Sequence, residues 1–295
     1  MDTKLTGKTR IESDLIGARE IPAEALYGVQ TLRGIENFSI SKFRLSEYPL
    51  FIKGLAITKM AAAMANFELG LLTVEQKDAI IAACGEILDG KHHDQFPVDM
   101  IQGGAGTTTN MNANEVIANR ALELMGHERG EYQYCSPNDH VNCSQSTNDA
   151  YPTAIHIGMY FKHLQLLPHL EELIASFRKK GEEFSQIIKM GRTQLEDAVP
   201  MTLGQTFNGF ASILQDEIAH LNEAAADFLV VNMGATAIGT GICAEPGYAE
   251  KCIAALREIT GWDIRLSSDL VGATSDTSCL VGYASAMKRV CVKMN

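Results

Sequence analysis

A row of apolar residues at near-heptad spacing in the second half of the chain limits the folds open to it. Thr202 and Gln205 have the spacing of a capping box, which predicts the start of a helix. The apolar positions along that helix are Leu203, Phe207, Phe210, Leu214, Leu221, Ala224, Phe228 and Val231. Because a single helix cannot bury such a row, the pattern predicts a bundle of long helices. The partner helices can belong to other copies, which favours an oligomer, or to the same chain.

Other segments also have helical periodicity. Residues 151–190 carry leucines along one side, and Pro168 among them predicts a kink or a local break. Thr73 and Gln76 form a second capping box, and Gly90 is expected to end that helix. Further helices are expected over residues 50–69, 249–259 and 276–294.

The first 50 residues have no long helical pattern, and we expect turns and short extended pieces there. The character of the chain changes near Asn142, where short helices and loops give way to long helical patterns. We therefore predict a mainly α protein with a mixed N-terminal domain over residues 1–142. Residues 143–295 are predicted to form a central domain of long bundled helices.

Bulk properties exclude several classes of partner. The formal net charge of −11 and the lack of a basic cluster disfavour nucleic acid or an acidic membrane surface. The N-terminus has no apolar signal core, and we expect no run long and apolar enough to span a bilayer. Seven cysteines without CxxC spacing fit a reduced compartment better than a disulfide framework. We therefore expect a cytoplasmic protein.

A dense polar motif begins at Gln102 with the sequence QGGAGTTTNMNANEVIAN. Its glycines permit backbone shapes that other residues resist, and its threonines and asparagines supply neutral hydrogen-bonding groups. Asn112 and Glu115 have capping-box spacing, so a helix is expected to begin there. A helix start preceded by N–H groups and hydroxyls suits an anion. The motif therefore predicts recognition of a small carboxylate.

Three more polar segments lie beside predicted helix ends. They are SQSTNDAYP at 144–152, GRTQLEDAVP at 191–200 and GATAIGTG at 234–241. Taken singly, each has an ordinary structural interpretation as a helix cap or turn. Arg192 is more simply explained as an ion-pair partner, and Cys143 as a small packed residue. The histidines are scattered without ligand spacing, so we expect no metal site and no cofactor.

Taken together, the four motifs resemble the aspartase/fumarase superfamily. The resemblance extends to RIESDLIGAREIPAEALYGVQTLRGIENF near the start and to QFPVDMIQGG before the first motif. GGAGT, STNDAYP and GATAIGTG favour the aspartate ammonia-lyase branch over class II fumarases. Gln194 points the same way, although it stands where fumarases, and some aspartases, usually have histidine.

The resemblance implies a reversible elimination of ammonia from L-aspartate to give fumarate, through an aci-carboxylate intermediate. It also implies a homotetramer whose active sites combine residues from three subunits. Thr107, Ser146, Thr147 and Asn148 would hold the carboxylates. Thr193 and Gln194 would orient the substrate or its amine side.

One family signature is missing from the 295 residues. It is a GSSxMPxKxNP loop that carries the general-base serine, so we assign no catalytic residue to this chain. By resemblance the chain corresponds to the N-terminal three-fifths of an aspartase, with its helical bundle incomplete. We expect the isolated 295-residue chain to have little or no lyase activity. The alternatives are a fumarate hydratase-type lyase, or an inactive fragment that retains only folding and assembly.

Overall fold

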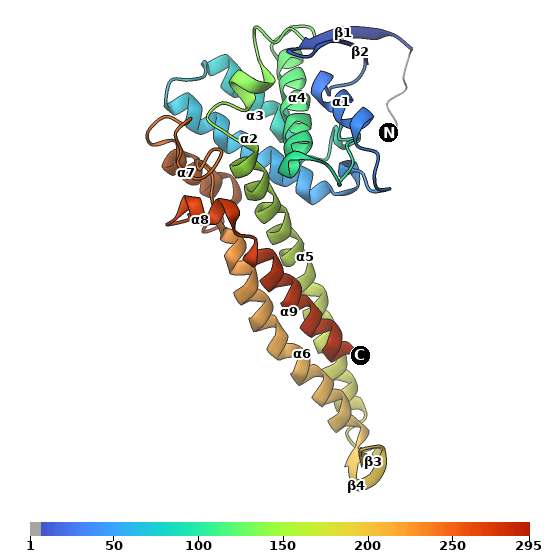
Figure 1. Cartoon of the computed structure of the whole chain (residues 1–295). Coiled ribbons are helices and arrows are strands. Elements are labelled where there is room, and N and C mark those ends of the chain that lie inside the picture. Colours follow the sequence, from blue (N-terminus) through green and yellow to red (C-terminus); the bar gives the residue numbers. More distant parts are fainter. Residues whose placement is uncertain (1–6) are drawn as a thin grey trace. The chain divides into compact units, whose positions relative to one another are not determined.

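The computed structural model describes residues 7–295, which divide into two compact units (Figure 1). Unit 1 comprises the described residues up to Met159 together with Leu229–Asp276. Unit 2 comprises Tyr160–Phe228 and Thr277–Asn295. Each unit is formed by two separate stretches of the sequence, because the chain returns to unit 1 at Leu229 and to unit 2 at Thr277. Whether 1–142 and 143–295 fold as separate domains stays a prediction.

Unit 1 contains most of the helices and two small sheets. Its strands are β1 (Thr9–Asp14), β2 (Gly17–Pro22), β5 (Val230–Val231) and β6 (Arg265–Leu266). Strands β1 and β2 form an antiparallel hairpin, whereas β5 and β6 are parallel. Its helices are α1 (Val29–Asn37), α2 (Pro49–Glu68), α3 (Val74–Leu88), α4 (Thr107–Leu124), α7 (Tyr248–Thr260), α8 (Leu270–Ser275) and the start of α5 (Thr147–Glu183).

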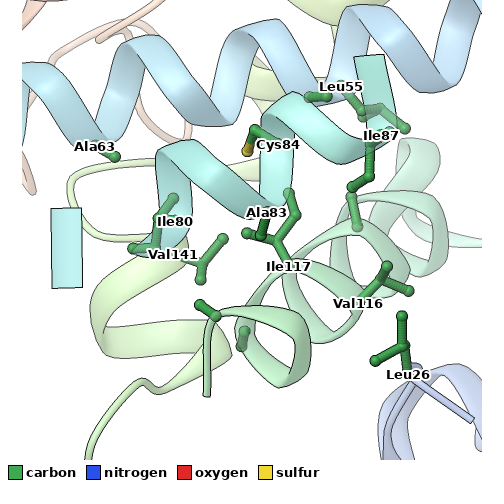
Figure 2. Close-up of a cluster of buried hydrophobic side chains, with 14 of the residues drawn as sticks. Leu26, Leu55, Ala63, Ile80, Ala83, Cys84, Ile87, Val116, Ile117 and Val141 are labelled. Carbon is green, nitrogen blue, oxygen red and sulfur yellow. The ribbon is translucent and has the colours of Figure 1, made fainter. Parts of the chain in front are cut away.

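The core of unit 1 lies among α2, α3 and α4. Leu55 of α2, Ile80 of α3 and Ile117 of α4 are almost fully buried and belong to one hydrophobic cluster (Figure 2). The predicted capping box at the start of α3 is confirmed, since Thr73 and Gln76 each accept from the other's backbone N–H. The core therefore fixes α4, and with it the first polar motif.

Helix α2 corrects one expectation about the chain. By length and composition it could cross a membrane, which the sequence reasoning did not anticipate. However, 67% of its most apolar window is buried inside the structure. Its alanines let α3 and α7 pack closely against it, as in the core helix of a globular unit.

Unit 2 contains the rest of α5, a hairpin of β3 (Ile188–Thr193) and β4 (Glu196–Thr202), α6 (Leu203–Ala226) and α9 (Ser278–Met294). The predicted capping box of Thr202 and Gln205 is confirmed. Leu214 and Leu221 of the predicted apolar row are buried in this unit. The row overruns the helix, because α6 ends at Ala226 and Val231 belongs to β5.

The start of α4 differs from the prediction. Helix α4 begins at Thr107 rather than Asn112, and the proposed Asn112–Glu115 capping box is wrong. Glu115 is buried and its carboxylate accepts from the N–H groups of Gly28, Gln30 and Thr31. It therefore caps α1, a helix distant in sequence, which a local spacing rule cannot reveal.

The helix predicted over residues 151–190 ends seven residues early, and the β3–β4 hairpin replaces its last turns. The predicted break at Pro168 is absent: α5 continues through this residue to Glu183. Pro168 and Leu164 are both exposed, so water can satisfy the carbonyl that the proline leaves without an N–H partner. The mainly α fold class is confirmed, and residues 7–50 are more regular than expected.

Candidate functional site

The N-terminus of α5 is built from the SQSTNDAYP motif. The Ser146 hydroxyl oxygen accepts from the Asn148 N–H at 3.1 Å, and the Ser146 N–H donates to the Asp149 carboxylate at 2.9 Å. This reciprocal cap explains why the helix starts here. A hydroxyl that accepts one bond still has its own proton to donate. Ser146 can therefore offer a donor where the helix dipole favours an anion.

Asp149 ties this helix start to the fourth motif. Its carboxylate is fully buried and accepts from the N–H groups of Gly234 at 3.2 Å and Thr236 at 2.8 Å. Asn148 adds a bond from its side-chain amide to the Ala237 carbonyl at 2.7 Å. Burial raises the pKa of Asp149 to about 6. The GATAIGTG loop is thereby held against α5, which sequence reasoning did not foresee.

Pro152 lacks the N–H group that would continue the hydrogen bonding of α5, and a side chain outside the helix replaces it. In a helix its donor would bond the carbonyl four residues earlier, which is that of Asn148. The side-chain amide of Asn232 donates to this carbonyl at 3.0 Å, and the same amide donates to Thr274 at 3.1 Å. The segment after β5 therefore supports the polar start of α5 from behind.

The first motif meets the same helix start at two points. Asn110 of α4 donates to the Thr147 hydroxyl oxygen at 3.3 Å. Gly106 has a φ of +92°, and a Cβ there would lie 2.5 Å from the Tyr151 ring. The glycine is thus required both by the backbone conformation and by the close approach of α5. Thr107 is exposed, and its hydroxyl donates to the Gly104 carbonyl.

A buried lysine lies behind these groups. Lys59 of α2 has no exposed surface, and its Nζ donates to the side-chain oxygens of Asn110, Asn142 and Gln145. Neither Lys59 nor Asp149 was identified from the sequence. The signal for Asp149 was its position three residues after Ser146, which is capping spacing. A lysine within an Ala- and Met-rich helix was the corresponding signal for Lys59.

The third motif lies in unit 2, at the end of the β3–β4 hairpin. Thr193 pairs with Glu196, and Gln194 and Leu195 form the turn with φ of +51° and +68°. Both turn residues are non-glycine in a left-handed conformation, which is a strained arrangement. Arg192 bonds Asp197 at 3.0 Å, as expected of an ion-pair partner.

Three of the four motifs therefore converge in unit 1, and the third belongs to unit 2. Ser146, Thr147 and Asn148 occupy consecutive positions at the start of α5, with Asn110 bonded to Thr147. Burial raises the pKa of the Cys143 thiol, which fits a packed residue better than a nucleophile. Among residues 7–295, no group of three or more His, Cys, Asp or Glu side chains is arranged to hold a metal ion.

Nearly the whole chain is similar to known lyases. A protein-family model described as lyase matches residues 17–295. An aspartate ammonia-lyase of Pseudomonas canavaninivorans is 54% identical over 97% of this chain and 60% of its own length. A fumarate lyase:delta crystallin structure from Brucella melitensis has a TM-score of 0.95 and 50% identity, covering 97% of this chain and 62% of that one. A class II fumarase from Schistosoma mansoni has a TM-score of 0.92 and 32% identity, covering 97% and 63%.

Proposed function

The chain belongs to the lyase family, and from that membership we propose that the complete protein is an aspartate ammonia-lyase. It would convert L-aspartate reversibly to fumarate and ammonia. The observation that carries the proposal is the 54% identity to an aspartate ammonia-lyase over nearly the whole chain. The chain spans about three fifths of the length of the curated relatives it matches.

The arrangement of donors supports this chemistry. When a proton leaves the carbon beside a carboxylate, negative charge spreads onto that carboxylate, so an enzyme must offer preorganised donors to it. Ser146 and Thr147 each accept a bond from the protein and keep a hydroxyl proton for a ligand. Both lie at the positive end of a 37-residue helix. Neutral donors of this kind stabilise the charged carboxylate without a permanently paired cation.

We assign the residues of unit 1 to the carboxylates. Ser146, Thr147 and Asn148 would hold the substrate carboxylates, with Thr107 at the adjoining start of α4. For Thr107 to donate to a ligand, its hydroxyl has to turn away from the Gly104 carbonyl. Thr193 and Gln194 of unit 2 would orient the substrate or its amine side. None of the residues 7–295 is proposed as the general base.

We further propose that the complete protein is a cytoplasmic homotetramer. The support for self-association is the set of exposed apolar side chains along unit 2, which a partner helix could cover. Examples are Phe210 and Ile213 of α6 and Val281 and Val292 of α9. The absence of CxxC spacing among seven cysteines supports a reducing compartment.

An absorbance assay separates the proposed activity from fumarate hydration. The complete protein is incubated with fumarate, once with ammonium and once in buffer without it. The proposal predicts loss of fumarate absorbance with ammonium and none with water as the only nucleophile. Conversion of malate to fumarate at a comparable rate would instead favour a fumarate hydratase.

A further inference from the structure

The contacts of Lys59 match those of a charged ammonium. Its Nζ lies 2.7 Å from the Asn110 oxygen, 3.0 Å from the Asn142 oxygen and 2.8 Å from the Gln145 oxygen. An ammonium donates three bonds and accepts none, so three acceptor oxygens satisfy it completely. Burial lowers the pKa of Lys59 to about 7, and the Asp149 carboxylate opposes that shift. The three amide oxygens also oppose it, since they bond the charged form.

This ammonium fixes the direction of the amides around it. Because it cannot accept a bond, each amide must turn its oxygen toward Lys59 and its NH2 group away. The Asn110 NH2 group then faces the Thr147 hydroxyl oxygen at 3.3 Å and the Asn142 oxygen at 3.1 Å. Gln145 uses its NH2 group on the carbonyls of Val141 and Cys143. Every donor in the set therefore points away from the buried charge.

A chain of donors runs from this charge to the edge of the site. Lys59 donates to Asn110, and Asn110 donates to Thr147. The Thr147 oxygen is occupied as an acceptor, so its proton is directed to another partner. Consecutive hydrogen bonds polarise one another, and in a low-dielectric interior a charge at the first donor strengthens the last. The Thr147 hydroxyl is neutral, but two hydrogen bonds connect it to the charged Lys59 ammonium through Asn110.

We infer that Lys59 is a positioning residue which, through Asn110, makes the Thr147 hydroxyl a stronger and better-oriented donor to a ligand carboxylate. The inference rests on the proposed function, in which Thr147 contacts a substrate carboxylate.

A double-mutant cycle tests the relay with succinate, an unreactive dicarboxylate. Calorimetry on the complete protein gives its affinity for the wild type, Thr147→Val, Lys59→Met and the double variant. Each single substitution is expected to weaken binding about tenfold, and Lys59→Met should have little further effect once Thr147→Val is present. Thr147→Ser, which keeps the hydroxyl, should bind within about threefold of the wild type. Additive losses in the double variant would show that Lys59 is only a scaffold and would overturn the relay.

Asn110→Asp provides a second test if Lys59→Met does not fold. The aspartate still accepts from Lys59 but cannot donate to Thr147, whose proton it would capture instead. Succinate affinity is expected to fall about tenfold or more. Normal affinity in Asn110→Asp, together with a loss in Thr147→Val, would refute the relay and leave the proposed function standing. A wild type that binds no succinate would refute both.

Discussion

At the residue scale, Asp149 joins two motifs that are 85 residues apart. Asp149→Ala would leave the part-buried N–H group of Ser146 and the buried N–H groups of Gly234 and Thr236 without this acceptor. We predict a loss of about 2–4 kcal/mol in the free energy of unfolding, measured by urea denaturation. Asp263→Ala is the control, because its side chain is 75% exposed, and it should cost less than about 0.5 kcal/mol. Equal effects of the two substitutions would contradict the proposed role of Asp149.

Gly106 allows a separate prediction about the first motif. Gly106→Ala combines a φ of +92° with a Cβ 2.5 Å from Tyr151, so it should displace the loop and cost about 2–4 kcal/mol. Gly126→Ala has a similar φ of +82° with nothing within 4 Å, and should cost about 1–2 kcal/mol. Urea unfolding of both variants separates backbone strain from steric overlap. A Gly106 variant no less stable than the Gly126 variant would show that the contact with Tyr151 is unimportant.

Sequence patterns identified the residues at the surface of the site but not those behind them. Ser146, Thr147 and Asn148 could be proposed because small polar residues before a helix have a recognisable spacing. Lys59 and Asp149 could not, because charged residues are mostly exposed and burial depends on tertiary packing. Their role is visible only when contacts distant in sequence are known, such as that from Lys59 to Gln145.

At the element scale, an ion-pair cluster joins α3 to α4. Arg120 bonds both carboxylate oxygens of Glu86, at 2.6 and 2.8 Å. The hydrogen bonds from Arg120, with His92 beside them, lower the pKa of Glu86 to about 2. The folded pKa lies below the unfolded value of about 4.3, so the stabilisation is complete above that pH and is lost as pH falls through 2.

Glu86→Gln should therefore lower the free energy of unfolding by about 1–3 kcal/mol at pH 7. The difference from the wild type should shrink between pH 4 and pH 2, as measured by urea unfolding at several pH values. Glu75→Gln on the exposed side of the same helix should cost less than about 0.5 kcal/mol. A difference between Glu86→Gln and the wild type that does not change with pH would argue against this ion pair.

The backbone of the turn in the β3–β4 hairpin is strained, and substitution of its two central residues tests how much this strain lowers stability. Gln194 and Leu195 both have positive φ, where Asn-Gly is the preferred pair. Replacing them with Asn and Gly should raise the free energy of unfolding by roughly 1 kcal/mol, seen as a higher thermal midpoint. A lower midpoint would mean that the native side chains stabilise the turn despite its backbone.

Long helices were the elements best predicted from the sequence. Capping boxes at Thr73 and Thr202 located the starts of α3 and α6, since both depend on residues three positions apart. The β3–β4 hairpin was missed because its strands are short and Pro200 lies within the second. The start of α4 was misplaced because Glu115 caps a different helix.

At the scale of the whole molecule, the proposed function requires a carboxylate site in unit 1 at the start of α5. The fold and family follow from motifs that occur in the expected order along the chain and match the lyase family from residue 17 onward. The placement of Thr193 and Gln194 on a separate unit could not be foreseen, because periodicity does not report which segments form a compact body.

The most direct measurement is kcat/KM for fumarate formation from L-aspartate by the complete protein carrying Thr147→Val or Thr147→Ser. Loss of one preorganised donor to the developing charge typically costs about 100-fold or more, so we predict that loss for valine. Serine keeps the hydroxyl and should stay within about tenfold of the wild type. A valine variant with wild-type kcat/KM would contradict the assignment of the site, and a wild type that forms no fumarate from L-aspartate would contradict the proposed function.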